Sequence, residues 1–120
     1  MDKKTLKEKL IKSADKFAQR IYPLTYKFPQ EEKFALGDQI RRSVISVPAN
    51  IIEGFARGGE KEKRNFFNIA YASLKEAKYL VYFAHKQGVI NEKDYKLAFI
   101  NGEEVSKLLF TFLKILKKSS

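Results

Sequence analysis

The chain has 120 residues, contains no cysteine, and carries 24 Lys plus Arg against 14 Asp plus Glu, a formal net charge of +10. This length fits one domain with one core, and the lack of cysteine excludes disulfides, thiolate zinc sites and cysteine nucleophiles. The charge favours polyanionic partners, namely nucleic acid, an anionic membrane surface or an acidic protein, although excess lysine also improves solubility without any partner.

Three breaks divide the chain into four segments with the apolar spacing of a helix face. They are YPLTYKFPQ, ARGGEK and KQGVINEKD. Asp2 and Asn91 are suitable N-caps, and Gly88 is a suitable C-terminal cap. The pattern predicts four helices and no strand, over about 3–22, 30–56, 60–87 and 92–117. Helices of this length with short connections predict a single all-α domain over 1–120, an antiparallel up-down-up-down four-helix bundle.

The second helix contains RRSVISVPANIIEGFARGG, in which a proline interrupts an otherwise helical pattern. Pro48 cannot donate a hydrogen bond to the carbonyl of Val44 and crowds it, so the helix should kink or break there. A kink is favoured because the apolar spacing continues through the proline without a phase shift. On a helical wheel, one arc is apolar and an opposite arc is a polar seam, formed by Arg42, Ser46, Asn50, Glu53 and Arg57.

Two interpretations of this seam are open, a structural network and a catalytic site. Residues three or four apart on a helix are in contact, and Glu53 precedes Arg57 in the favourable acid-before-base order. One glutamate without a second acid, histidine or cysteine nearby is a poor catalytic site. The only histidine, His85, lies near the end of the third helix, and Asp38 is 15 positions from Glu53. We therefore expect no catalytic residue, no metal and no cofactor.

A family resemblance is carried by QIRRSVISVPANIIEGFARG, which follows LTYKFPQEEKFAL, and by NFFNIAYASLKEAKYLVYFAHKQGVI in the third helix. These runs resemble bacterial four-helix-bundle proteins known as 23S ribosomal RNA intervening-sequence proteins. That family is similar to the accessory variability protein of diversity-generating retroelements. The resemblance implies a ring-shaped homo-oligomer of five subunits, RNA or DNA binding, and a protein partner such as a reverse transcriptase. It implies no known reaction.

The resemblance also assigns structural or interface roles to particular positions of the motif. Ile52 departs from the family pattern, which commonly has a small residue there. The matched positions, with the seam residues, are Arg41, Arg42, Ser46, Pro48, Ala49, Asn50, Glu53, Gly54 and Arg57.

The basic residues are unevenly distributed. Residues 1–22 carry seven basic and three acidic groups and residues 58–88 carry six and three, whereas residues 30–57 balance at four and four. This places the basic surface on the first and third helices, and lysine predominates, which favours contact with phosphates over reading of bases. The candidate phosphate contacts are Lys3, Lys4, Lys7, Lys9, Lys12, Lys61, Lys63 and Arg64.

Other hypotheses remain beside nucleic-acid binding. The broad apolar faces of the second and third helices indicate either self-association or a large aromatic core, and the chain could serve as a scaffold that docks an acidic partner protein. The basic first helix could lie on a membrane, but the bundle needs its apolar stripe. The N-terminal residues lack the apolar core of a signal peptide and no apolar run approaches the roughly 20 residues of a membrane span. We therefore expect a cytoplasmic protein.

Overall fold

The computed structural model describes residues 2–119, with only the backbone for residues 118 and 119. The four long helices are α1 (Lys3–Ile21), α3 (Leu36–Phe55), α4 (Glu60–Lys86) and α5 (Glu92–Ser119). A 3-10 helix, η1 (Tyr22–Lys27), and the short α2 (Gln30–Lys33) connect α1 to α3. Residues 2–119 contain no strand, so the all-α prediction is confirmed.

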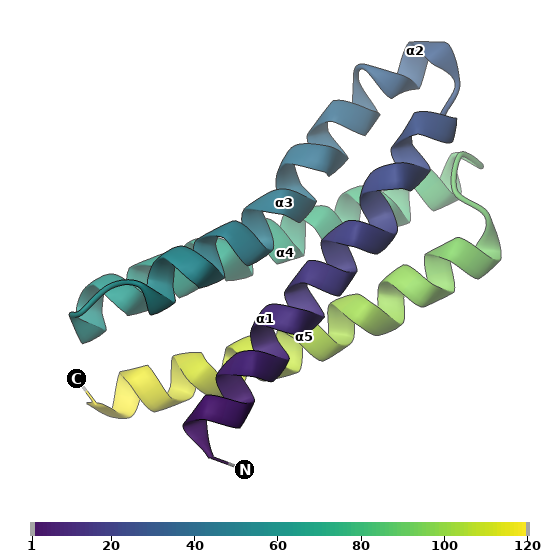
Figure 1. Ribbon diagram of the computed structural model, residues 1–120. Helices are drawn as coiled ribbons and strands as arrows, with labels where there is room; N and C mark the ends of the chain where they lie inside the picture. Colours follow the sequence, from purple (N-terminus) through teal and green to yellow (C-terminus); the bar gives the residue numbers. More distant parts are fainter. Residues whose placement is uncertain (1, 120) are drawn as a thin grey trace.

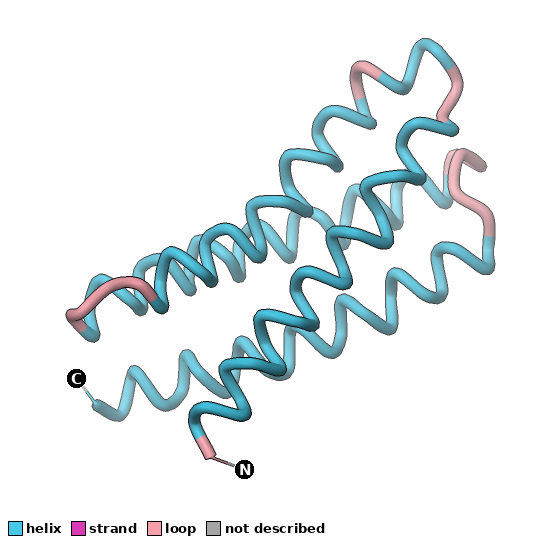
Figure 2. Tube along the Cα trace, viewed as in Figure 1, coloured by secondary structure: helices cyan, strands magenta, loops and turns pink. Residues whose placement is uncertain are grey.

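The helices surround one core in an elongated molecule of 46 × 24 × 17 Å. Helix α1 packs against α3 and α5, and α4 packs against the same two helices, whereas no Cα atom of α1 lies within 8 Å of a Cα atom of α4 in the described residues. Figure 1 views the molecule from the side of α1 and α3, with α4 behind α3. The connecting loops lie at the two ends of the helices (Figure 2). The four helices therefore occupy the four corners of the cross-section.

The helix ends follow local sequence signals. The Asp2 carboxylate accepts a hydrogen bond from the backbone N–H of Thr5 at 2.8 Å, and the Asn91 side-chain oxygen accepts one from Asp94 N–H at 2.7 Å. Gly88, just after α4, has φ +81°, a left-handed conformation that favours glycine. These contacts place the ends of α1, α4 and α5 close to where the sequence predicts them.

The predicted second helix differs from the structure in its first part. The sequence predicts one helix over about 30–56, whereas the structure has α2, a turn at Phe34 and Ala35, and then α3. In a continuous helix the carbonyl of Lys33 would accept the N–H of Gly37. Here it accepts Nη2 of Arg41 at 3.0 Å instead. A tertiary contact thus takes the place of the helical hydrogen bond at the break.

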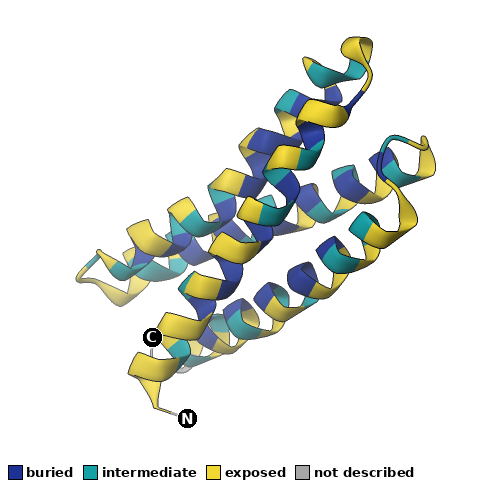
Figure 3. Ribbon diagram, turned by 45° about the vertical axis from the view of Figure 1, so that its right-hand side comes forward, coloured by how far each residue is buried: buried dark blue, intermediate teal, exposed yellow. Residues whose placement is uncertain are grey.

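The core consists of the apolar stripes of the four long helices (Figure 3). At the end of the bundle where α3 meets α4, Phe55, Phe67 and Phe112 pack edge to face with ring centroids 4.9–5.9 Å apart. The residues with no exposed surface include Leu10, Ile21, Ile40, Val44, Val47, Ile51, Phe67, Leu74, Val105 and Leu109.

Pro48 lies inside α3, which continues from Leu36 to Phe55. A complete break of the helix at Pro48, the alternative to a kink, is therefore absent. The apolar residues on both sides of the proline, Val44, Val47 and Ile51, are all fully buried. The kink at Pro48 stays a prediction.

Candidate nucleic-acid interface

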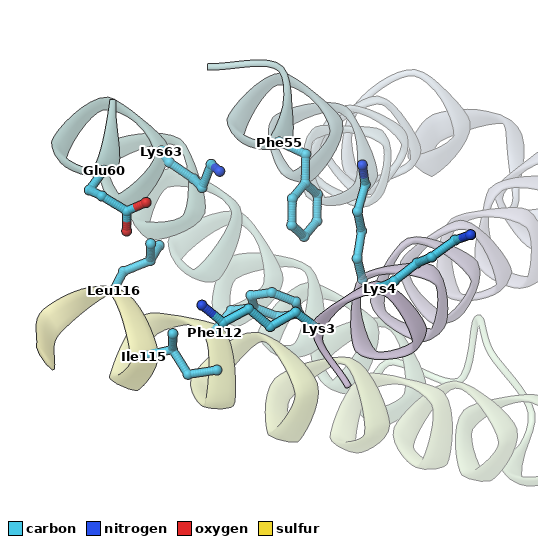
Figure 4. A pocket seen from close by; sticks show the side chains of 9 residues that line it. Lys3, Lys4, Phe55, Glu60, Lys63, Phe112, Ile115 and Leu116 are labelled. Atoms are coloured by element: carbon cyan, nitrogen blue, oxygen red, sulfur yellow. The ribbon is translucent and has the colours of Figure 1, made fainter. Parts of the chain in front are cut away.

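One end of the molecule contains a hollow of about 350 Å³ where all four long helices contribute side chains. The first two turns of α1, the last turn of α3, the start of α4 and the last turns of α5 meet there. Figure 4 shows the side chains of Phe55 and Phe112 facing this hollow, with Glu60 and Lys63 side by side on α4. The lining residues are Lys3, Lys4, Lys7, Phe55, Glu60, Lys63, Phe112, Ile115 and Leu116.

The hollow combines an aromatic surface with a basic margin. The rings of Phe55 and Phe112 meet edge to face at 5.2 Å, and Nζ of Lys7 lies 5.1 Å from the centroid of the Phe55 ring. An ammonium group over a ring face is held by a cation–π attraction. Among the residues whose side chains the structure describes, four lysines and one carboxylate, Glu60, line the hollow. This arrangement attracts an anionic group and offers it an apolar surface alongside.

The helix dipoles largely cancel at this end, because α3 and α5 end here and a helix C-terminus carries a partial negative charge. Helices α1 and α4 both begin here, and a helix N-terminus carries a partial positive charge. The α1 N-terminus is capped by Asp2, whereas the residue before α4, Gly59, provides no side-chain cap. Glu60 and Glu62 in the first turn of α4 offset part of this field. The lysines therefore supply most of the attraction of this hollow for anions.

The structure brings four of the eight predicted phosphate contacts together and separates the others. Lys3, Lys4, Lys7 and Lys63 line the hollow. Lys9 and Lys12 point to the other side of α1 and line a second hollow of about 250 Å³ against α5. Lys61 and Arg64 lie on the first turns of α4 and line neither hollow.

The second hollow contains a basic residue that sequence reasoning missed. Lys16 lines it together with Lys9 and Lys12. Ser13 and Glu104 also line it, and Ser13 Oγ donates a 2.7 Å hydrogen bond to Glu104 Oε1. Positions 9, 12 and 16 follow the spacing of one helix face. This spacing is the signal that could have identified Lys16.

The middle of the polar seam of α3, formed by Ser46 and Asn50, lies at the contact with α4. Ser46 Oγ and Ser73 Oγ of α4 lie 2.7 Å apart, and the Asn50 amide donates to both the carbonyl oxygen and Oγ of Ser46, at 2.8 and 2.9 Å. Asn50 is thus linked to α4 through Ser46. These three side chains are half-buried, so within the chain they act as a helix–helix contact.

Of the other seam residues, Arg42 and Glu53 are exposed and Arg57 is half-buried. Glu53 Oε1 and Arg57 Nη2 form the i, i+4 ion pair at 3.3 Å, and the Arg57 guanidinium lies 4.8 Å from the ring centroid of Phe66 on α4. Arg42 is exposed and lines a shallow hollow beside Ser46 and Ser73. The carboxylate of Glu53 is engaged by Arg57.

Arg41 differs from its neighbour Arg42 because it is buried, with 8% of its surface exposed. Its guanidinium donates to Thr25 Oγ1 at 2.7 Å and to the Lys33 carbonyl at 3.0 Å, and it pairs with Asp38. It also lies 4.8 Å from the ring centroid of Tyr26. Arg41 therefore ties η1, α2 and α3 together.

The imidazole ring of His85 contacts residues of the turn between α4 and α5 and of α5 itself. Its Nδ1 lies 3.0 Å from the Ile90 carbonyl, its Nε2 lies 3.2 Å from Glu92, and its ring stacks on Tyr95 at 4.4 Å. Within residues 2–119, no group of three or more His, Asp and Glu residues is placed to hold a metal ion. In the same part of the chain, no helix is long and apolar enough to cross a membrane.

Comparison with known proteins decides the family. A sequence model described as 23S rRNA-intervening sequence protein matches residues 7–111, most of the chain. The chain belongs to the 23S rRNA-intervening sequence protein family. No curated protein is significantly similar to it.

A solved structure supports the same assignment. A crystal structure of a protein with unknown function from the S23 ribosomal protein family of Bacteroides thetaiotaomicron VPI-5482 superposes with a TM-score of 0.84 at 27% sequence identity. The similarity covers 91% of this chain and 98% of that one. In this 23S rRNA-intervening sequence protein, the matched segment contains the whole seam, Lys7 and Lys63, whereas Lys3 and Lys4 precede it.

Proposed function

We propose that this 23S rRNA-intervening sequence protein binds RNA or DNA without catalysis, largely through attraction to the phosphate backbone. The observation that carries the proposal is the convergence of Lys3, Lys4, Lys7 and Lys63 on one hollow, in which Glu60 is the single carboxylate among the described residues. Each phosphate neutralised by a lysine releases counterions from the nucleic acid, which supplies affinity that falls with salt.

The proposed contact has little sequence specificity. All four basic side chains of the hollow are lysines, which act as point charges, whereas bidentate reading of guanine favours arginine. Phe55 and Phe112 provide an apolar surface beside the lysines on which an unpaired base could lie. Single strands and flexible ends are therefore preferred over duplexes.

The functional unit in this proposal is a homo-oligomeric ring of five protomers, each an antiparallel up-down-up-down bundle kinked at Pro48. The five-fold count comes from the family resemblance. Support for self-association comes from large apolar side chains left exposed on the long helices, among them Ile45, Ile52, Tyr79 and Phe99. A ring repeats the +10 charge of each chain and gains avidity for a polyanion. We place this assembly in the cytoplasm, where RNA is available to it.

A second candidate function is a scaffold that docks an acidic partner protein, such as a reverse transcriptase, without touching nucleic acid. The same hollow favours it, because lysines around an aromatic surface also suit carboxylates beside apolar side chains. The two functions differ in which polyanion is bound.

The test compares two variants of equal charge. In the first, Lys3, Lys4, Lys7 and Lys63 are changed to Gln; in the second, the same change is made at Lys27, Lys33, Lys93 and Lys96, which lie toward the opposite end of the molecule. Fluorescence anisotropy with a short single-stranded RNA is measured from about 50 to 200 mM salt. The first variant should lose affinity and lower the salt slope by up to about 3, at roughly 0.7 per lost phosphate contact, while the second changes little.

Three outcomes would each refute one part of the proposal. No binding of RNA or DNA by the wild-type chain at low salt refutes nucleic-acid binding and leaves the acidic-partner function. Equal losses in both variants refute the hollow as the site, because net charge alone then explains binding. Cleavage of the RNA probe during the incubation, by wild-type protein freed of contaminating nuclease, would refute the absence of catalysis.

A further inference from the structure

The lysines of α1 lie on two nearly opposite sides of this helix. We call the hollow at the end of the bundle the end hollow; its α1 residues are Lys3, Lys4 and Lys7. We call the hollow between α1 and α5 the side hollow; its lysines are Lys9, Lys12 and Lys16. At about 100° per residue, the two sets project in nearly opposite directions from the helix axis. The proposed function uses the end hollow and leaves the side hollow without a role.

The side hollow, of about 250 Å³, is positively charged. Glu104 is its one carboxylate among the described residues, and Oε1 of Glu104 accepts a 2.7 Å hydrogen bond from Oγ of the buried Ser13. None of its three lysines forms an ion pair in the part of the chain that the structure describes. Lys107, exposed on α5 one turn after Glu104, adds a further positive charge nearby. The ammonium groups of this hollow are therefore available to an anion.

These lysines form a row along the helix. Lys9, Lys12 and Lys16 follow the spacing of one helix face and extend over about 10 Å at 1.5 Å per residue. Arg20, half-buried and one turn after Lys16, continues the same side of α1. A row of cations in a groove suits the repeated phosphates of a nucleic-acid strand, which proteins without sequence preference follow in the same way.

Carboxylates separate the two basic sides on the outer surface of α1. Glu8 and Asp15 are exposed, lie on one stripe, and project between Lys4 on one side and Lys12 on the other. Neither carboxylate forms an ion pair within the described residues. A strand that crossed from the end hollow to the side hollow over this surface would bring its phosphates beside both carboxylates, which repel them. The opposite surface of α1 is packed in the core. The two hollows are therefore separate sites and not one continuous track.

We infer that the side hollow is a second nucleic-acid-binding site, so that one chain holds two single-stranded segments on opposite sides of α1. This inference rests on the nucleic-acid binding in the proposed function and adds a bridging activity to it. A helix with its side chains is about 10–12 Å across, so the two segments would lie side by side at about that distance. Both sites belong to one chain, so bridging requires no ring.

The lining of the side hollow favours nucleic acid over an acidic protein as its occupant. Leu108 is the only apolar side chain that lines it among the described residues. A protein interface needs a buried apolar centre, whereas contact with a phosphate backbone is made by charged and polar groups. The side hollow offers the second kind of surface.

The test counts RNA strands bound per chain. Isothermal titration calorimetry at about 50 mM salt uses a single-stranded RNA of about six nucleotides, within the size range of single-strand binding sites. The side-hollow variant carries Lys9→Gln, Lys12→Gln and Lys16→Gln. The end-hollow variant carries the four Gln substitutions already described for that hollow. A count per chain does not depend on how many chains assemble.

Two further variants serve as controls. The first carries Lys27→Gln, Lys93→Gln and Lys96→Gln, which removes the same charge from exposed lysines elsewhere. The second carries Lys9→Arg, Lys12→Arg and Lys16→Arg, which keeps the charge of the side hollow. Circular dichroism and the thermal midpoint confirm that each variant is folded.

Two separate sites predict two strands per wild-type chain and one strand in either the side-hollow or the end-hollow variant. A chain with both sets of substitutions should bind none at this salt. Both control variants should still bind two.

Other results overturn the inference in distinguishable ways. One strand per wild-type chain, with affinity lowered in both hollow variants, indicates one continuous site and leaves nucleic-acid binding intact. An unchanged count and affinity in the side-hollow variant confines binding to the end hollow. A loss that the exposed-lysine control shares assigns the second strand to net charge. A wild-type chain that binds no RNA refutes the proposed function together with the second site, and binding of a polyglutamate peptide in its place would assign these lysines to an acidic protein.

Discussion

Gly54 of α3 lies directly against the ring of Phe67 on α4. A Cβ atom at position 54 would be 2.6 Å from Cε1 of Phe67 and 3.3 Å from the Lys63 carbonyl oxygen. Phe67 has no exposed surface and packs edge to face against both Phe55 and Phe112. Moving the ring to make room for a Cβ atom would disturb its packing against Phe55 and Phe112, so glycine suits this close approach of α3 to α4.

Gly54→Ala is expected to destabilise the fold by about 1–2 kcal/mol, because overpacking costs about 1–3 kcal/mol and the better helix propensity of alanine returns part of it. Chemical denaturation measures the change. Gly58→Ala is the matched control, because a Cβ there meets nothing within 4 Å, and its effect should stay within about 0.5 kcal/mol. Equal midpoints for the two variants would contradict the close approach.

Arg41 offers a second prediction, on the corner formed by η1, α2 and α3. Arg41→Met removes the donors that Thr25 Oγ1 and the Lys33 carbonyl use. We expect a loss of about 2–3 kcal/mol in the free energy of unfolding, since hydrogen bonds from a charged group are each worth about 1.5–3 kcal/mol. Limited proteolysis should show faster cleavage between residues 22 and 35.

The adjacent arginine is the control for this variant. Arg42 is exposed, so Arg42→Met should change stability by less than about 0.5 kcal/mol. Arg41→Lys should restore little, because one ammonium group cannot reach the separate acceptors that the planar guanidinium contacts. Full stability of Arg41→Lys would show that charge alone, and not the fork geometry, holds the corner.

Local patterns in the sequence were sufficient to predict much of the fold. Helical spacing predicts the apolar stripe that contains Val44, Val47 and Ile51, and all three side chains are fully buried. The Asp2 and Asn91 caps were predicted from residue type alone and are formed. These features depend on neighbours within one or two turns, so the sequence of one helix is enough to predict them.

Features that depend on distant residues could not be predicted in this way. The break at Phe34 and Ala35 is accompanied by the reach of Arg41 to the Lys33 carbonyl, eight residues away. The basic residues at positions 3–12 and 61–64 are predicted from the sequence to form a basic surface on the first and third helices. Which of them meet depends on how α1 is rotated against α3 and α5, and that rotation directs Lys7 toward Lys63 but Lys9 toward α5.

The seam supports a prediction about coupling between two residues on different helices. Asn50 of α3 and Ser73 of α4 both hydrogen-bond Ser46 Oγ. Because they share this atom, Asn50→Ala and Ser73→Ala should not be additive, and a double-mutant cycle should give a coupling of about 0.5–1 kcal/mol. The cycle is measured by urea denaturation.

The cycle also tests whether the seam acts within the chain. Asn50→Ala should lower stability without changing the mass of the assembly, if Ser46 and Ser73 are the partners that matter. A cycle of Asn50→Ala with Asn65→Ala, an exposed position on α4, should show no coupling. Additivity of Asn50→Ala and Ser73→Ala, together with loss of assembly, would place the seam at a contact between subunits instead.

The ion pair between Lys78 of α4 and Glu103 of α5 predicts a dependence of stability on pH. The Lys78 ammonium, 2.6 Å from Glu103 Oε1, donates a hydrogen bond to it and lowers the pKa of Glu103 below its ordinary value of 4.5. A carboxyl group whose pKa is lower in the folded state stabilises that state above its unfolded pKa. This contribution is lost as the pH falls through the folded pKa.

The Glu103→Gln variant should therefore be less stable than the wild type at neutral pH, and the difference should shrink as the pH is lowered from about 4.5 toward 2. Glu103 is 41% exposed, so the difference should be less than about 1 kcal/mol and should decrease with added salt. Thermal unfolding across this pH range measures it, with Glu76→Gln, an exposed carboxylate on α4, as the control for loss of one negative charge. If the two variants lose the same stability at neutral pH, and both losses fade together in acid, the effect belongs to net charge and not to the contact with Lys78.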